Sequence, residues 1–345
     1  MKQEKPLSLT VLLSNWFSIS MLFISGEVVL RYGAKAGFVM VLAFLVALIL
    51  VFPLLKEKRL SNVSTDWLRL FWLMEVILLQ LFIGIILIKE IFSFAIFEAA
   101  FWTIMGSLFF TLLLKYVKKL LTLFEISLLS LIFGMAILLP NYVYLQKGLE
   151  TVYHNLLHYH PKLLHQDQTG INGLFFLLVL IFFSKLFVQI PVLRQVTGST
   201  NGKGFRKLII AGIIWSTIVL AFSTMTIVSI TQNMTIVHSN ELVPELLRKL
   251  STPFIFYTVL ISFYIGTFIK IALSFLTFLD FPHKGSLSPK LIYLTLGCLI
   301  VLVPYLYVKE YTVLAIFLYV GALLSSLTIL SFLFSLVKNL TMKNQ

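Results

Sequence analysis

The stretch NWFSISMLFISGEVVLRYGAKAG, from Asn15 to Gly37, decides how the rest of the chain is interpreted. It begins as an apolar run that should enter a membrane, and it then meets Ser25, Gly26 and Glu27 in succession. These residues are poor at continuing a helix in hydrocarbon, because serine competes for backbone hydrogen bonds and a buried carboxylate needs a partner. An interrupted helix frees carbonyl and amide groups that can bind a solute or an ion. The alternative is that the helix simply ends near Glu27, at the outer interface.

The composition indicates a polytopic membrane protein. Of the 345 residues, 59% are hydrophobic and 12% are charged, whereas a soluble domain carries about 25% charged residues. The apolar runs form ten segments, each long enough to cross about 30 Å of hydrocarbon. We therefore predict an all-α membrane domain with no soluble domain, whose segments cover residues 8–32, 37–55, 67–89, 93–114, 120–145, 173–193, 207–230, 253–279, 288–308 and 311–337.

The lysines and arginines predict the orientation. If the N-terminus is cytoplasmic, 17 of the 27 fall on the inner side and 8 on the outer side. This bias favours an even number of crossings with both termini in the cytoplasm, and we expect a bacterial inner membrane. The net charge of +13 does not indicate a nucleic-acid partner, because the basic residues are dispersed in short loops.

Two long outer connections organise the chain. Residues 146–172 separate five segments (8–145) from five more (173–338), and an odd number per half predicts that the halves are inverted relative to each other. The second connection contains ELVPELLRKL, residues 241–250, whose apolar spacing predicts a short helix over the outer mouth.

Ionisable residues inside the apolar runs are the first candidates for a solute site, because a charge in the bilayer usually faces a bundle interior or a water cavity. In the inverted scheme the sixth segment corresponds to the first, so we expect it to be interrupted around Phe182 to Leu186, beside Lys185. The alternative for Lys185 is a structural ion pair with a buried glutamate. The predicted solute-binding residues are Ser25, Gly26, Glu27, Glu75, Ser184 and Lys185.

Lys270 is the candidate for energy coupling. It shares a helix face with Thr267 and Ser274, which are spaced three and four residues from it. A buried ammonium there can take the place of a coupling cation, and it can also load and unload a proton. The alternative is that Lys270 only holds neighbouring helices together.

Other chemistry has little support in the sequence. Cys298 is the single cysteine, so a disulfide framework and a cysteine metal site are excluded. No phosphate loop, nucleotide fingerprint or Ser/His/Asp set is visible, so we expect neither an enzyme nor a bound cofactor. The first outer connection gathers four histidines, which we interpret as a solvated loop rather than a metal site: His154, His158, His160 and His165.

The ten segments, the inner N-terminus and the FISGE stretch (Phe23 to Glu27) resemble the amino acid/polyamine/organocation superfamily and the wider leucine-transporter-type fold. The resemblance covers nearly the whole chain and implies a solute between segments one and six, with three and eight completing the site. It also implies an ion at segments one and eight, where Lys270 favours a proton over sodium. The short chain is also similar to permease-like subunits of spore germinant receptors, which sense small molecules.

These observations predict a secondary transporter of a small polar solute, with an amino acid as one candidate. It would work by alternating access, coupled to a proton or ion gradient. Two alternatives remain open: a non-transporting sensor or receptor subunit on the same fold, and a structural membrane protein without a ligand.

Overall fold

The computed structural model describes residues 9–56, 66–117, 120–148, 150, 153–154, 157–158, 170–197, 202–230, 240, 242–279 and 289–341. Within these ranges every regular element is a helix and no strand occurs. Eight of the helices are long and apolar enough to cross a membrane. The prediction of an all-α polytopic membrane protein is therefore confirmed.

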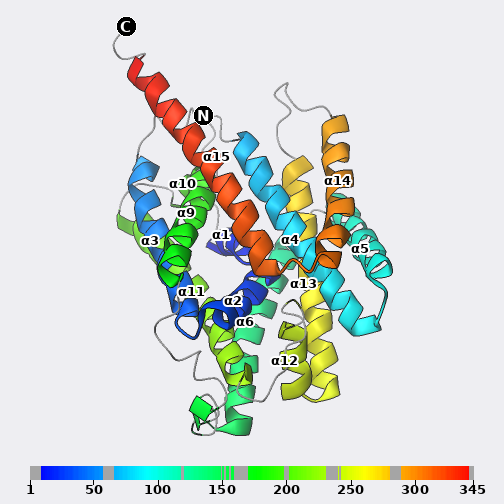
Figure 1. Cartoon of the computed structure of the whole chain (residues 1–345). Helices are drawn as coiled ribbons and strands as arrows, with labels where there is room; N and C mark the ends of the chain where they lie inside the picture. Colours follow the sequence, from blue (N-terminus) through cyan, green and yellow to red (C-terminus); the bar gives the residue numbers. More distant parts are fainter. Residues whose placement is uncertain are drawn as a thin grey trace.

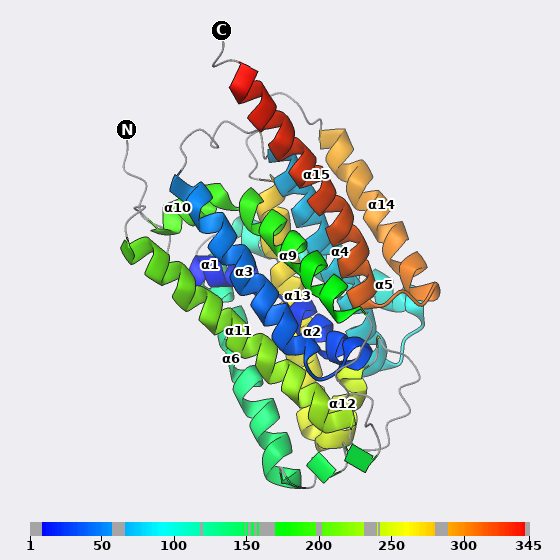
Figure 2. The ribbon, with the colours of Figure 1, turned by 60° about the vertical axis from the view of Figure 1, so that its left-hand side comes forward.

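The helices form a bundle in which consecutive long helices run in alternating directions (Figures 1 and 2). The end of α15 lies at the top of Figure 1, and α12 lies at the bottom. The short helix predicted at 241–250 is present as α12. In chain order the helices are α1 (Leu9–Trp16), α2 (Ile19–Tyr32), α3 (Ala36–Lys56), α4 (Asp66–Phe92), α5 (Ile96–Tyr116), α6 (Leu120–Lys147), α9 (Ile171–Val188), α10 (Ile190–Thr197), α11 (Gly202–Ile230), α12 (Leu242–Leu250), α13 (Pro253–Leu279), α14 (Pro289–Val308) and α15 (Val313–Thr341).

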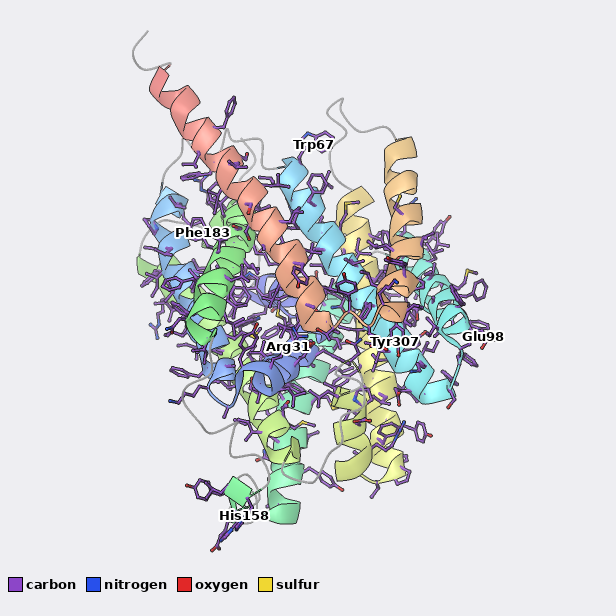
Figure 3. All side chains as sticks on the ribbon, in the orientation of Figure 1. Arg31, Trp67, Glu98, His158, Phe183 and Tyr307 are labelled. Carbon is purple, nitrogen blue, oxygen red and sulfur yellow. The ribbon has the colours of Figure 1, made fainter. Side chains whose placement is uncertain are left out.

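Apolar side chains fill the interior and also cover the outside of the bundle. Trp215, Phe82 and Phe263 are fully buried, whereas Phe97 and Phe109 are exposed. An apolar outer surface is what contact with lipid requires. Figure 3 shows side chains along the whole bundle, from Trp67 near one end to His158 at the other.

The first predicted segment is interrupted, but not where the sequence suggested. Helix α2 runs without a break through Ile24 to Glu27, so the predicted position is wrong. The break lies at Phe17 and Ser18, between α1 and α2, where Ser18 has an extended backbone (φ −151°, ψ 151°).

A hydrogen bond within the helix and close packing against neighbouring helices explain why α2 stays regular. The Ser25 hydroxyl donates a hydrogen bond to the Leu22 carbonyl at 2.9 Å, within the same helix. Gly26 packs closely beneath α11 and α12, since a Cβ there would lie 2.9 Å from Thr226 Oγ1 and 3.5 Å from Leu242 Cδ2. The glycine that seemed to break the helix instead permits a close approach between helices.

The sixth predicted segment is also interrupted, again away from the predicted place. Helix α9 is regular from Phe182 to Leu186, so that prediction is wrong as well. The chain turns at Gln189 (φ −87°, ψ 1°) and continues as α10. Pro191 accounts for the turn, because proline has no N–H to donate and its ring clashes with the carbonyl four residues earlier.

Candidate functional site

Lys270 lies at the break in the first segment. Its Nζ, on α13, donates hydrogen bonds to the carbonyl oxygens of Ser14 at 2.5 Å and Asn15 at 3.0 Å. Both carbonyls belong to the last turn of α1. The ammonium therefore lies against the carbonyl end of α1, beside the break.

The other two predicted coupling residues have different surroundings. Thr267 and Ser274 are buried on α13, as their shared face with Lys270 predicted. The Thr267 hydroxyl donates to the Tyr264 carbonyl at 2.7 Å, within its own helix. Of these three side chains, Lys270 is the one that binds the carbonyls of the break.

The two breaks meet in space, which the sequence did not predict. Trp16 is the last residue of α1, and Gln189 lies at the turn between α9 and α10. The Trp16 indole N–H donates a hydrogen bond to Gln189 Oε1 at 3.1 Å. Rings pack around this bond: Phe44 stacks on Trp215 at 4.0 Å, and Trp16 meets Phe44 edge-on at 5.2 Å. Phe182 completes the cluster, so aromatic side chains fill the space between the first and sixth segments.

Lys185 forms an ion pair with a buried glutamate, which was the alternative to a solute-binding role. Its Nζ donates to Glu75 Oε1 at 2.9 Å, joining α9 to α4. The rings of Trp72 and Phe317 lie 5.1 Å and 4.9 Å from the same Nζ. Glu75 is fully buried and Lys185 is 17% exposed, so the pair sits at an edge of the buried interior. Ser184 is buried beside it.

Glu27 serves as a helix cap instead of lining a break. Its Oε2 accepts a hydrogen bond from the Leu314 backbone N–H at 2.8 Å, in the first turn of α15. A carboxylate is favourable there, because unpaired N–H groups and the helix dipole both attract negative charge. Thr312 Oγ1 caps the same turn by accepting from Ala315 N at 3.1 Å.

The turn before α15 is also tied to the segment that leads into α12. Asn240 Nδ2 donates to the Tyr311 carbonyl at 2.8 Å, and Asn240 Oδ1 accepts from Val313 N at 3.2 Å. At the other end of α12, Arg248 pairs with Glu90 of α4 at 2.5 Å. Helix α12 also packs on α2, α11 and α13, so it closes this end of the bundle.

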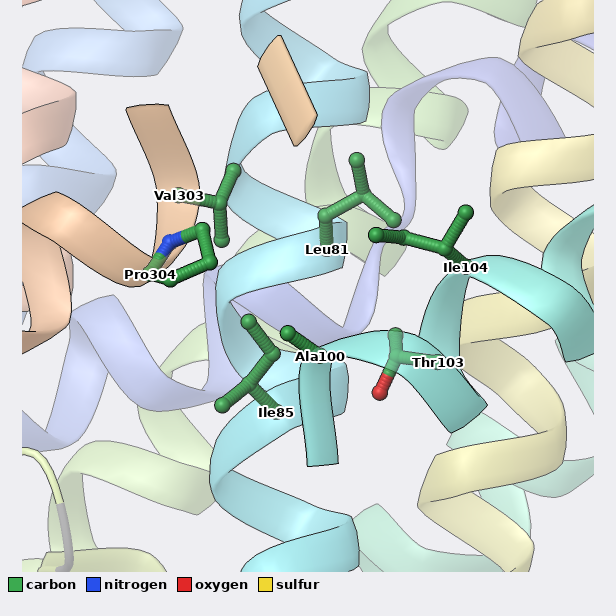
Figure 4. Close-up of a pocket in the computed structure, with 7 residues that line it drawn as sticks. All are labelled: Leu81, Ile85, Ala100, Thr103, Ile104, Val303 and Pro304. Carbon is green, nitrogen blue, oxygen red and sulfur yellow. The ribbon is translucent and has the colours of Figure 1, made fainter. Parts of the chain in front are cut away.

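A narrow hollow, with no space for a water-sized molecule, lies between α4, α5 and α14 (Figure 4). Its lining is apolar except for Thr103, whose hydroxyl already donates to the Ala99 carbonyl at 2.7 Å. The other lining residues are Leu81, Ile85, Ala100, Ile104, Val303 and Pro304. The hollow is therefore poorly suited to a polar solute.

Among the residues that the structure describes, no three His, Cys, Asp or Glu side chains gather as metal ligands. The rings of His154 and His158 stack at 5.5 Å. His160 and His165 lie outside the described residues.

The structure brings the predicted residues together in three places. Lys270 is at the first break, Glu75 pairs with Lys185, and Ser25, Gly26 and Glu27 lie on α2 toward α12 and α15. No protein-family model matches the sequence, and no curated protein matches it. The functional argument therefore rests on the geometry of these places.

Proposed function

We propose that the protein is a secondary transporter that moves a small polar solute by alternating access, coupled to a proton gradient. One observation carries the proposal: two interrupted membrane segments meet at their breaks through Trp16 and Gln189, and Lys270 binds the Ser14 and Asn15 carbonyls at the first break. Carriers of this kind use broken helices to hold solutes and ions near the middle of the membrane.

The helix contacts support two inverted halves of five segments. In such a repeat α2 corresponds to α9, α3 to α11, α4 to α13, α5 to α14 and α6 to α15. The observed contacts come in the expected pairs: α2 packs on α11 as α9 packs on α3, α5 on α13 as α14 on α4, and α6 on α13 as α15 on α4. The contact between α4 and α13 and the contact between α3 and α11 each join two corresponding helices, so the repeat maps each contact onto itself.

The departures from this symmetry support alternating access. Contacts of α6 with α11, of α2 with α15 and of α4 with α5 have no counterpart of similar extent in the described part of the chain. In a carrier, the opposite state would exchange such contacts for their counterparts. At one end of the bundle, α12 packs on α2, α11 and α13. The lysine and arginine bias supports placing that end outside and both termini in the cytoplasm of a bacterial cell.

Lys270 is the proposed coupling group. It forms no direct ion pair with a described residue, and Glu125 on α6 attracts its charge from farther away. Its protonated form makes charge-assisted hydrogen bonds to the Ser14 and Asn15 carbonyls, which are stronger than neutral ones. Loss of the proton weakens the link between α13 and α1, so proton release can be coupled to movement of the first segment.

Uptake in proteoliposomes with an imposed pH gradient tests the proposal, with labelled amino acids, nucleobases and amines as solutes. Lys270→Met keeps much of the side-chain length but removes the charge, so proton-driven accumulation should disappear while the protein still folds. Lys309→Met, at an exposed lysine, is the matched control and should transport normally. A well-folded Lys270→Met protein with undiminished proton-driven uptake would eliminate the coupling role.

A sensor on the same fold is the second candidate. It is favoured by the aromatic cluster around Trp16, because these rings fill the space between the first and sixth segments. A solute that raises the melting temperature without being taken up would identify a sensor. A structural protein without a ligand would show neither effect.

A further inference from the structure

Gln80, in the middle of α4, is the most conspicuous polar side chain that the proposed coupling does not use. It is 0% exposed, and neither Nε2 nor Oε1 has a hydrogen-bond partner among the described residues. A carboxamide offers two N–H donors and an oxygen with two lone pairs. Such groups are normally satisfied when buried, by protein atoms or by ordered water.

The packing of α4 against α5 shows what Gln80 faces. The two helices are antiparallel, and a Cβ on Gly84 would lie 2.5 Å from Thr103 Cγ2. One turn further along both helices, in the direction from Gly84 to Gln80, the residue opposite Gln80 is Ser107. Leu81 and Ile104 line the same hollow, which agrees with this register.

Ser107 belongs to a buried row of hydroxyls on α5. The hydroxyls of Thr103, Ser107 and Thr111 each donate to the carbonyl four residues earlier, at 2.6–2.7 Å. Each hydroxyl oxygen keeps acceptor capacity after making that bond. The row therefore offers acceptors next to a carboxamide that lacks partners.

Helix α13 is the third helix that packs beside Gln80 and Ser107. The ring of Phe268 meets Gly106, where a Cβ would lie 2.5 Å from Cζ, so α13 touches α5 beside Ser107. Lys270 follows Phe268 by two residues on α13, at about the same depth in the bundle.

We propose that Gln80 and Ser107 form a binding site between α4, α5 and α13 for a small neutral group that both donates and accepts hydrogen bonds. Two sources have this chemistry: an ordered water molecule, and a hydroxyl or amide group of the transported solute. The water source does not depend on the transport proposal, whereas the solute source rests on it.

Hydroxyl-radical labelling by X-ray radiolysis tests the site in the full-length protein in lipid nanodiscs, because radicals form at bound water and label nearby rings. Phe268 should be labelled despite its burial, at a rate well above that of the fully buried Phe263 on the same helix. Gln80→Leu and Ser107→Ala should each lower Phe268 labelling at least about threefold, since each removes a partner of the bound group. Ile77→Leu, at a buried position on α4, should leave it unchanged.

A mixture of amino acids, nucleobases and amines then distinguishes the two sources. If the mixture protects Phe268 and Gln80→Leu raises the KM for uptake about tenfold, the solute supplies the group. If Phe268 is still labelled in the presence of the mixture, a water molecule supplies the group. The proposal is overturned if Phe268 is labelled no faster than Phe263, and a higher melting temperature of Gln80→Leu would then show that the carboxamide has no partner to lose.

Discussion

Two glutamates that looked alike in the sequence, Glu27 and Glu75, are held in opposite ways. Glu75 is paired with the ammonium of Lys185, so its charge is balanced by another buried charge. Glu27 is bound by the Leu314 backbone N–H at the start of α15, so its charge is balanced by a helix terminus. The first arrangement depends on ionisation of both partners, whereas the second needs only a hydrogen-bond acceptor. Buried carboxylates in membrane helices can therefore have different structural roles that the sequence alone does not distinguish.

The largest expected effect is on the Glu75–Lys185 pair. Lys185→Met leaves Glu75 as an uncompensated buried charge, and breaking a buried pair in this way costs about 3–5 kcal/mol. Glu75→Gln should be similarly damaging to Lys185. The double variant Glu75→Gln/Lys185→Met removes both charges and should recover most of the stability, as measured by the melting temperature of the purified protein. Equal losses of stability in the single and double variants would mean that the broken ion pair is not the cause of the destabilisation.

Glu27 should be less sensitive. Glu27→Gln keeps an acceptor for the Leu314 N–H and should cost less than about 1 kcal/mol. Glu27→Ala removes the cap and should cost about 0.5–2 kcal/mol. Unfolding of the two variants in the same detergent gives the comparison directly. If Glu27→Gln is as destabilising as Glu75→Gln, the charge of Glu27 matters and the contrast between the two glutamates fails.

A further comparison concerns Gly26, one residue before Glu27. Gly26→Ala places a methyl group 2.9 Å from Thr226 Oγ1 and should destabilise the protein by about 1–3 kcal/mol, toward the low end because a side-chain atom can shift. Gly134→Ala, on α6, meets nothing within 4 Å and should stabilise its helix by about 0.5–1 kcal/mol. Thermal unfolding of both variants should show shifts of opposite sign. A gain in stability for Gly26→Ala would contradict the close packing beneath α12.

The sequence predicted the all-α membrane fold well because apolar runs of this length have one stable form in lipid. It also predicted that the first and sixth segments are interrupted, but it placed both breaks wrongly. Ser25 stays helical because its hydroxyl bonds to the Leu22 carbonyl of the same helix, and Gly26 stays helical because α11 and α12 pack against it, which no local pattern reveals. Pro191 was the better local signal for the second break.

The candidate site was predicted in part. Lys270 does reach the first segment, as its depth and polar face suggested, and Lys185 does pair with Glu75. Gln80 was missed because it is uncharged, and only its burial in the folded bundle makes its unpaired groups conspicuous. The contact of Trp16 with Gln189 joins residues 173 positions apart, so it emerges only from the tertiary structure.

The ammonium at the first break is part of the chain, and this changes what the protein can respond to. A dissolved ion fills such a site only as its concentration allows, whereas Lys270 is held beside the Ser14 and Asn15 carbonyls at a fixed effective concentration. Its occupancy is therefore independent of the salinity of the medium. Acidity remains the external variable that can act on it, so a carrier of the proposed kind would work equally well in sodium-poor and sodium-rich surroundings.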